Sequence, residues 1–273
     1  MNKQVKNLVA LALDEDIGTG DVSASLLDDK IISAQIIARE PAVMCGVDYA
    51  QMAFLLLNKD IQLEWHFSDG EQIDNAQVLC TLSGSANSII SAERVALNFL
   101  QTLSGVATQT KILVDKIAHT KVKLLDTRKT LPGLRLAQKY AVQCGGGVNH
   151  RMGLYDCVML KENHIITSGS IKNSVSAATE RYPKLPLIVE VENIAQLNET
   201  LDLTEVNRVL CDNFSIKDLK QAVALSNGKK PLEASGNIGE NTIVEVAQTG
   251  VDYISTGAIT KNIQAIDLSL RFN

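Results

Sequence analysis

The chain has 273 residues, of which 45% are hydrophobic, and its formal net charge at pH 7 is −5. This length permits one large domain or two modest ones, and the acidic balance argues against a long polyanion such as a nucleic acid as a partner. Because the chain starts with an amphipathic stretch and contains no apolar run long enough to cross a bilayer, we expect a cytoplasmic protein without a membrane partner.

Residues 1–105 are expected to mix helices and strands. Their apolar periodicity predicts helices at 5–13 and 50–57 and strands at 31–38 and 62–67. Asp69-Gly70 and Ser83-Gly84 are turn signals. A long helical region is predicted from Ser88 to about His119, with Gly105 as the expected break.

Short apolar runs and amphipathic stretches alternate regularly after residue 120. The strands are predicted at 122–126, 157–160, 187–191, 206–211, 232–234 and 253–255. The helices between them are predicted at 134–142, 171–181, 194–201, 216–226 and 240–249. This alternation indicates a parallel sheet, either an open doubly wound sheet or an incomplete barrel.

Polar residues of types that suit phosphate, metal or carboxylate end each predicted strand. They are Thr127-Arg128-Lys129, Lys161-Glu162-Asn163, Glu190 with Glu192, Asp212-Asn213, Ser235-Gly236-Asn237 and Ser255-Thr256-Gly257. An open sheet concentrates its site at one switch point, whereas a barrel gathers side chains from the carboxyl ends of all its strands. Six such ends favour the barrel, so we expect an α/β fold with an incomplete, TIM-like parallel barrel of about six strands. The mixed helices and strands of residues 1–105 precede it as an N-terminal part of α/β (α+β) type. We assign residues 1–110 to the first domain and 111–273 to the second, with the tail 262–273 packing on the first.

A basic segment lies inside this acidic chain. Residues 94–161 contain eleven lysines and arginines against three aspartates, which predicts a pocket for a highly anionic small ligand. Arg94, Arg128 and Arg151 can each hold a carboxylate through two hydrogen bonds. Lys161 ends a buried-type apolar run, where a lysine is costly unless it has a partner or a role.

The last two strand ends are small and rich in hydroxyl groups. Ser235, Gly236 and Asn237 follow one strand, and Thr256 and Gly257 follow the next. The loops after the final strands of a barrel commonly hold a phosphate against backbone N–H groups. We expect this pair of loops to bind phosphate, although either loop alone is also typical of an ordinary turn.

Glu190 and Asp212 end two successive strands. Their spacing suits a divalent metal that bridges phosphate oxygens, and it equally suits a structural neutralisation of nearby cations. A glycosidase acid pair is a further alternative, which the surplus of cations disfavours because neutral sugars do not require it.

The five cysteines are odd in number, widely spaced and without a CxxC pair. They are Cys45, Cys80, Cys144, Cys157 and Cys211. This spacing predicts reduced cytosolic thiols, mostly buried, and not zinc ligands. Cys144 stands beside the run Gly145-Gly146-Gly147, which is a helix C-cap or leaves room for a ligand. It is an alternative nucleophile, but no oriented base is evident.

Across nearly the whole chain these residues resemble the quinolinate phosphoribosyltransferase family, also called nicotinate-nucleotide pyrophosphorylase (carboxylating). The most specific block is Asp126-Thr127-Arg128-Lys129-Thr130-Leu131-Pro132-Gly133-Leu134-Arg135. Other matching blocks are Glu93-Arg94-Val95-Ala96-Leu97-Asn98, Asn149-His150-Arg151, Lys161-Glu162-Asn163-His164, Glu190-Val191-Glu192, Asp212-Asn213, Glu233-Ala234-Ser235-Gly236 and Gly257-Ala258. The chain departs from some members at Asn237 and Lys261, where those members have glycine and histidine.

The resemblance implies a homodimer in which Arg94 reaches into the partner's site. It implies that quinolinate is surrounded by Arg128, His150, Arg151 and Lys161, with Lys129 between quinolinate and phosphoribosyl pyrophosphate. It further implies Mg²⁺ as cofactor, with Glu190 and Asp212 at the ribose hydroxyls and the Mg²⁺–pyrophosphate. The 5-phosphate would be held by Ser235, Gly236 and Gly257, with Asn237 and Thr256 beside them. The expected catalytic residues are Lys129, Lys161, Glu190 and Asp212.

The implied activity converts quinolinate and phosphoribosyl pyrophosphate to nicotinate mononucleotide, pyrophosphate and CO₂ in de novo NAD biosynthesis. Both substrates are anions, and two unit charges about 6 Å apart repel by roughly 3 kcal/mol at an effective dielectric of about 20. The basic segment would offset this repulsion. The alternatives are a phosphoribosyltransferase of the same fold with another acceptor, as in the molybdenum-locus relatives, a barrel aldolase with Lys161 as Schiff-base lysine, and a non-catalytic anion-binding module.

Overall fold

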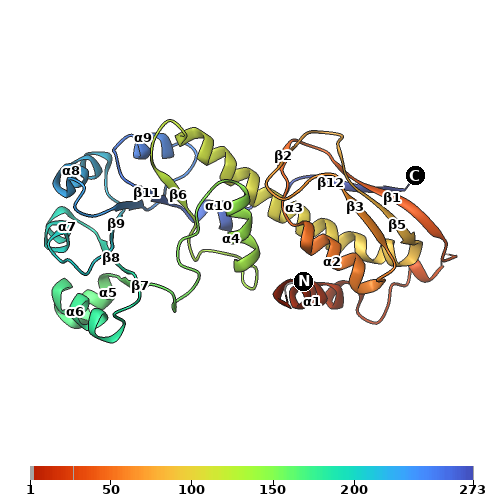
Figure 1. Cartoon of the computed structure of the whole chain (residues 1–273), viewed down its shortest axis with the longest axis horizontal. Helices are drawn as coiled ribbons and strands as arrows, with labels where there is room; N and C mark the ends of the chain where they lie inside the picture. Colours follow the sequence, from red (N-terminus) through yellow and green to blue (C-terminus); the bar gives the residue numbers. More distant parts are fainter. Residues whose placement is uncertain (1–2, 27, 273) are drawn as a thin grey trace. The chain divides into compact units, whose positions relative to one another are not determined.

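The computed structural model describes residues 3–26 and 28–272 (Figure 1). Two compact units divide the chain, and each unit contains segments that are distant in sequence. Unit 1 takes in Met1–Lys111, Pro132–Gly146 and Ile263–Asn273, and unit 2 takes in Ile112–Leu131 and Gly147–Asn262. In the described ranges, none of the helices combines the length and the apolar character that a membrane span requires.

A four-stranded antiparallel sheet is the frame of unit 1. Its strands in spatial order are β12 (Leu268–Phe272), β1 (Ile31–Ala38), β5 (Val78–Ser85) and β3 (Gln62–Trp65). A separate two-stranded ladder joins β2 (Ala42–Val43) to β4 (Gln72–Ile73). In β1 the alternate residues Ala34, Ile36 and Ala38 are buried, as the period of two in a strand requires. The C-terminal strand β12 is held in this unit by its pairing with β1.

Helices lie on one side of this sheet (Figure 1). They are α1 (Lys3–Ile17), α2 (Val47–Leu57) and the part of α3 (Ala86–Ile117) that belongs to unit 1. Unit 1 also contains the short η1 (Ala24–Leu26) and α4 (Arg135–Cys144). α1 buries Val5, Val9 and Leu13, which recur every four residues and form one apolar face.

Gly105 does not break α3, contrary to the prediction. A Cβ atom at this position would lie 2.2 Å from the carbonyl oxygen of Gln264. The lack of a side chain at Gly105 therefore lets the segment before β12 approach the helix. A glycine inside a helix lowers the stability of the helix by about 1 kcal/mol. Gly84 has a similar role, because its Cβ would lie 2.8 Å from Cγ1 of Ile61. Ser83-Gly84 was predicted as a turn but lies inside β5.

Unit 2 is built on a six-stranded parallel sheet with the order β6-β11-β10-β9-β8-β7. The strands are β6 (Lys123–Leu125), β7 (Val158–Leu160), β8 (Leu187–Val191), β9 (Arg208–Asp212), β10 (Leu232–Ser235) and β11 (Tyr253–Ser255). The helices are α5 (Glu162–Ser168), α6 (Ile171–Arg181), α7 (Ile194–Leu201), α8 (Ile216–Ser226), α9 (Ile243–Ala247) and α10 (Ala258–Lys261). All six predicted strands are confirmed, whereas α5 and α10 were not predicted.

The sheet does not close on itself. β6 pairs with β11 and β7 pairs with β8, but among the described strands β6 and β7 do not pair with each other. The prediction of an incomplete α/β barrel of six strands is therefore confirmed. The chain between β6 and β7 carries Arg128, Lys129, His150 and Arg151. The predicted basic residues therefore lie on the connection between the two strands at which the barrel is open.

Candidate active site

A cavity of about 570 Å³ opens at the carboxyl ends of the strands of unit 2. Side chains that follow each of the six strands contribute to it, as is usual in barrels. The lining residues are Thr127, Arg128, Lys129, His150, Arg151, Met159, Lys161, Glu190, Leu210, Asp212, Asn213, Glu233, Ser235, Gly236, Asn237 and Ser255. Met159 and Leu210 form an apolar surface continuous with the buried residues Cys157 and Ile188.

The segment around Val148 lies along the free edge of β6. Val148 forms a parallel bridge with Leu125, and its N–H donates to the carbonyl of Leu124 at 2.9 Å. The fully buried Asp126 accepts a hydrogen bond of 2.8 Å from the N–H of His150. These bonds orient the doublet His150-Arg151 into the cavity although it lies outside any regular element.

Lys129 is fixed at its backbone by two hydroxyl groups. Its N–H donates to Oγ1 of Thr127 at 3.0 Å, and Oγ1 of Thr260 donates to its carbonyl at 2.7 Å. Its side chain packs over Gly257, where a Cβ atom would lie 2.7 Å from Cδ of Lys129. A side chain at position 257 would therefore displace the lysine.

Two guanidinium groups lie close together in the cavity. Burial, followed by the positive charge of Arg128, lowers the pKa of Arg151. Nη1 of Arg151 donates to the carbonyl of Cys157 at 3.2 Å, which leaves its other N–H groups available for a ligand. A pair of neighbouring cations favours a ligand with more than one negative charge.

Glu233 lies at the centre of a buried network. Its side chain is 0% exposed, and its Oε2 lies 2.9 Å from Nη1 of Arg208 and 3.2 Å from Nε2 of His150. Burial would raise the pKa of Glu233, but the nearby imidazole of His150, with Ser255 and Arg208, outweighs this effect and lowers the pKa. The guanidinium of Arg208 in turn lies 4.1 Å from the ring centroid of Tyr253. The network orients the imidazole of His150.

Carboxylates from β8 and β9 face the cations. Nζ of Lys161 makes a close ion pair with Oε2 of Glu190. Oδ2 of Asp212 accepts a hydrogen bond of 2.8 Å from the side-chain amide of Asn213. The cavity thus has a cationic part near β6 and β7 and a carboxylate part near β8 and β9.

The loop after β10 comes very close to the loop after β9. A Cβ atom on Gly236, which has a φ of 104°, would lie 2.2 Å from Oδ1 of Asn213. Asn213 and Asn237 also have positive φ angles, of 54° and 50°. Successive residues with a left-handed backbone can direct their N–H groups at an anion, and Asn213, Gly236 and Asn237 all line the cavity.

Both parts of the chain match one family. The family description "Quinolinate phosphoribosyl transferase, C-terminal domain" matches residues 106–271, and the N-terminal domain of the same name matches residues 21–104.

The chain belongs to the quinolinate phosphoribosyltransferase family.

Several relatives in this family match the chain over almost its full length. A quinolinate phosphoribosyltransferase (decarboxylating) 1b of Nicotiana tabacum is 39% identical, and the match covers 98% of this chain and 82% of the relative. A probable nicotinate-nucleotide pyrophosphorylase (carboxylating) of Bacillus subtilis is 37% identical, with 98% and 93% covered. The solved nicotinate-nucleotide pyrophosphorylase of Francisella tularensis has a TM-score of 0.98 and 48% identity, with 100% and 97% covered. The predicted family and fold class are confirmed.

The cavity brings together ten of the predicted site residues of this phosphoribosyltransferase-family chain. They are Arg128, Lys129, His150, Arg151, Lys161, Glu190, Asp212, Ser235, Gly236 and Asn237. Gly257 and Thr256 are buried beside it rather than in its lining, and the hydroxyl of Thr256 donates to the carbonyl of Ile238 at 2.6 Å. Arg94 is exposed on α3 in unit 1.

Sequence reasoning gave no site role to several lining residues, of which Glu233 and the apolar pair Met159 and Leu210 matter most. Glu233 stands in a matching block, but its burial under a histidine and an arginine could not be read from spacing. The strand periodicity was the available signal for the apolar pair, because alternate residues of a strand lie on the same face of the sheet.

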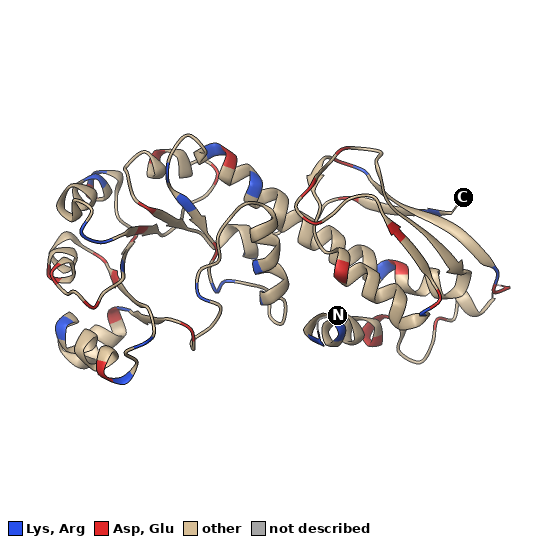
Figure 2. Cartoon of the chain, in the orientation of Figure 1, with Lys and Arg blue, Asp and Glu red and all other residues tan. Residues whose placement is uncertain are grey.

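Only some of the basic residues of the segment 94–161 line the cavity. Four of the eleven lysines and arginines line it, and Lys116 instead pairs with Glu240 at 3.3 Å. Arg135 and Lys139 lie on α4 in unit 1. Figure 2 shows that lysines and arginines are also spread over the helices of unit 2. The local doublets therefore predicted the site better than the summed charge did.

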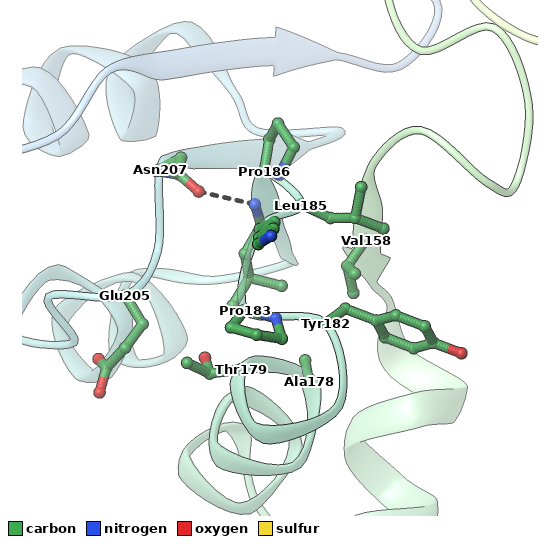
Figure 3. Close-up of a pocket in the computed structure, with 11 residues that line it drawn as sticks. Val158, Ala178, Thr179, Tyr182, Pro183, Leu185, Pro186, Glu205 and Asn207 are labelled. Carbon is green, nitrogen blue, oxygen red and sulfur yellow. Dashed lines mark hydrogen bonds between the residues drawn. The ribbon is translucent and has the colours of Figure 1, made fainter.

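A second cavity, of about 440 Å³, lies at the opposite edge of the same sheet, where β7, β8 and β9 begin (Figure 3). It is lined mainly by the Tyr182–Leu187 segment. Oδ1 of Asn207 accepts a hydrogen bond of 2.7 Å from the N–H of Leu187. Its charged lining residues are Lys184 and Glu205. The amino-terminal edge of a barrel usually serves stability, and this cavity has no comparable cluster of cations.

Proposed function

We propose that the chain is a cytoplasmic enzyme that converts quinolinate and phosphoribosyl pyrophosphate to nicotinate mononucleotide, pyrophosphate and CO₂ in de novo NAD biosynthesis. The supporting observation is a single cavity with four Lys and Arg side chains and three carboxylates, in a chain whose two parts both match this family. The described cysteines are free thiols, in keeping with a reducing compartment.

In this proposal the dicarboxylate binds at the cationic part of the cavity. Arg128 and Arg151 hold its carboxylates with paired hydrogen bonds, and His150 and Lys161 complete the contacts. The pyridine ring lies against the apolar surface of Met159 and Leu210. The observation that supports this placement is that both arginines line one cavity, in which the positive charge of Arg128 acts on Arg151.

The sugar and its phosphates bind on the carboxylate side. Glu190 and Asp212 hold the ribose hydroxyls, and the loop of Ser235, Gly236 and Asn237 holds the 5-phosphate against its N–H groups. The carboxylate oxygens fit Mg²⁺, a hard cation that prefers oxygen ligands and phosphate oxygens. When bound, Mg²⁺ supplies charge neutralisation for the leaving pyrophosphate.

The reaction joins the pyridine nitrogen to the anomeric carbon as the bond to pyrophosphate breaks. Positive charge develops on the sugar, and the carboxylates of Glu190 and Asp212 stabilise it electrostatically. The positive charge of the new pyridinium then stabilises the electron pair that stays on the ring carbon when the adjacent carboxylate leaves as CO₂. An ammonium group, from Lys129 or Lys161, protonates the resulting carbanion.

Release of labelled CO₂ tests this function. The wild-type protein is expected to release label from carboxyl-labelled quinolinate when phosphoribosyl pyrophosphate and Mg²⁺ are both present, and to release none when either is omitted. Nicotinate should not act as acceptor, because it lacks the carboxylate that the second guanidinium holds. Turnover of nicotinate without turnover of quinolinate would instead indicate a phosphoribosyltransferase with another acceptor.

We also propose that the enzyme is a homodimer and that Arg94 completes the site of the partner subunit. The exposure of Arg94 on α3 supports this role, since an arginine on a helix surface is available to another chain. Arg94→Ala and Lys161→Ala chains are each expected to be inactive alone and to regain part of the activity when mixed, because one of the two sites in the heterodimer is then intact. Heterodimers that form, as detected by two affinity tags, and remain inactive would contradict the shared site.

A further inference from the structure

Three side chains from separate segments of unit 1 converge on one point. Cys45 precedes α2, Asp69 lies in the turn between β3 and β4, and Cys144 is the last residue of α4. Their ligand atoms, two sulfurs and a carboxylate oxygen, all lie within 4.8 Å of one another. Cys45 is fully buried, while Asp69 and Cys144 are partly exposed. The cluster therefore lies at the protein surface, with one member in the interior and two members in contact with solvent.

Neighbouring groups hold the carboxylate and one of the thiols in place. The N–H groups of Gly46 and Val47 both donate to Oδ1 of Asp69, at 2.9 and 3.1 Å. The backbone of Cys45 is fixed through its N–H, which donates to Oγ of Ser104 at 2.9 Å, and through its carbonyl, which accepts from the same hydroxyl at 3.1 Å. The orientation of these two ligands is thus set by groups outside the cluster.

Tyr140 bridges the other two members. It lies one helical turn before Cys144 on α4, and its phenol is close enough to act on both Asp69 and Cys144. The sulfurs of Cys45 and Cys144 lie within 4.8 Å of each other. Outer groups that fix ligand orientation in this way are a regular property of protein metal sites.

The electrostatic surroundings favour a cation. The carboxylate of Asp48 lies close enough to act on Asp69, so that the cluster contains two thiols and a carboxylate beside a further acid. Two thiolates bound to one Zn²⁺ at about 2.3 Å lie roughly 3.8 Å apart in a tetrahedral site. Small side-chain rotations would bring the three ligands to that geometry.

We propose that Cys45, Asp69 and Cys144 bind a thiophilic divalent cation, Zn²⁺, with a water molecule as fourth ligand. Binding releases the two thiol protons to solvent and forms two Zn–S bonds, without any change of oxidation state. The ion would join the end of α4 to the start of α2 and so stabilise unit 1. Hard cations such as Mg²⁺ do not prefer thiolate ligands, so this site is separate from the metal of the reaction.

Cobalt substitution tests the site in the reduced, metal-free, full-length protein. Titration with Co²⁺ is expected to give one thiolate-to-cobalt charge-transfer band in the near ultraviolet and the visible bands of tetrahedral cobalt, saturating at one ion per chain. Zn²⁺ should displace the cobalt, and Mg²⁺ should not. Absence of these bands from the wild-type protein, with its thiols shown to be reduced, would overturn the proposal.

Substitutions of single residues test which side chains bind the cation. Cys144→Ser, at a partly exposed position, should weaken cobalt binding by more than about 100-fold, and Tyr140→Phe should weaken it by about 10-fold because it removes only an orienting group. Cys80→Ser, another buried thiol of unit 1, and Asp74→Asn, an exposed acid, are matched controls that should bind as the wild type does. Bands that persist in Cys144→Ser would show that the ion binds elsewhere and would overturn the assignment.

A second measurement does not depend on how well each variant folds. Zn²⁺ should raise the thermal unfolding midpoint of the wild-type protein, since a ligand that binds the native state stabilises it. The midpoint of Cys144→Ser should not respond. Formation of a Cys45–Cys144 disulfide with no uptake of Zn²⁺ or Co²⁺ by the reduced chain would overturn the proposal in favour of a redox pair.

Discussion

Replacing Glu233 with alanine is expected to destabilise the folded protein by about 3–5 kcal/mol, the usual cost of leaving buried charges without their partner. The carboxylate has no exposed surface, and both Arg208 and His150 approach its Oε2. Urea unfolding followed by circular dichroism measures the loss. The matched control is Glu240→Ala, which removes a half-exposed partner of Lys116 and should cost less than about 1 kcal/mol.

The same carboxylate predicts how stability depends on pH. Because the pKa of Glu233 is lowered below its usual 4.5 in the folded state, its stabilising contribution is fully present above that pH. The contribution is lost as the pH falls through the lower, folded value. Glu233→Gln should therefore be less stable than the wild type at neutral pH and should lose less stability on acidification. Parallel pH profiles for the two proteins would contradict this role.

Replacing Arg151 with alanine is expected to weaken quinolinate binding by roughly 100-fold, since charge-assisted hydrogen bonds contribute about 1.5–3 kcal/mol each. Phosphoribosyl pyrophosphate binding should remain near the wild-type value, because that ligand is proposed to lie at Glu190, Asp212 and the loop after β10. Separate calorimetric titrations with each ligand measure the two affinities. Arg128→Ala should behave in the same way.

Two further variants make this test specific. Arg151→Lys should recover only part of the affinity, because an ammonium group cannot form the paired contact of a guanidinium. Arg181→Ala, on an exposed position of α6 beside Tyr182, should leave both affinities unchanged. Equal losses for both ligands in Arg151→Ala would contradict the assignment of the cationic part of the cavity to quinolinate.

The sheet of unit 2 could be predicted because each strand is a short, buried apolar run that ends in a polar residue. Leu187–Val191 and Tyr253–Ser255 have the predicted bounds, since local burial alone determines them. The roles of glycines were predicted wrongly where the glycine is needed for a tertiary contact. The breaks expected at Gly84 and Gly105 are absent because both glycines accommodate residues that are remote from them, Ile61 in one case and Gln264 in the other.

The cavity could be predicted where residues that are adjacent in the sequence both line it, as in Arg128-Lys129 and His150-Arg151. Glu233 and its partners were not predictable in the same way, because they come from separate segments, and β9, β10 and β11 become neighbours only in the folded sheet. The cysteines give a similar lesson. Their spacing argued against zinc, yet the fold brings the ligand atoms of Cys45, Asp69 and Cys144 within 4.8 Å of one another. Ligand spacing along a chain is informative only when the ligands lie on one local element.

The gap between β6 and β7 has a consequence for how this enzyme family can change. The ribose side of the cavity is formed by residues of β8, β9 and β10, which have hydrogen-bonded neighbours on both edges. Insertions in these strands would therefore disrupt the hydrogen bonds of the sheet. The acceptor side lies on the connection from β6 to β7, whose loops are held by Val148, by Asp126 and by the hydroxyl of Thr260 on Lys129 rather than by strand pairing on both edges. Insertions in the loops on either side of α4 should therefore disturb few strand-to-strand hydrogen bonds, which makes these loops a favourable place for a new acceptor specificity to arise.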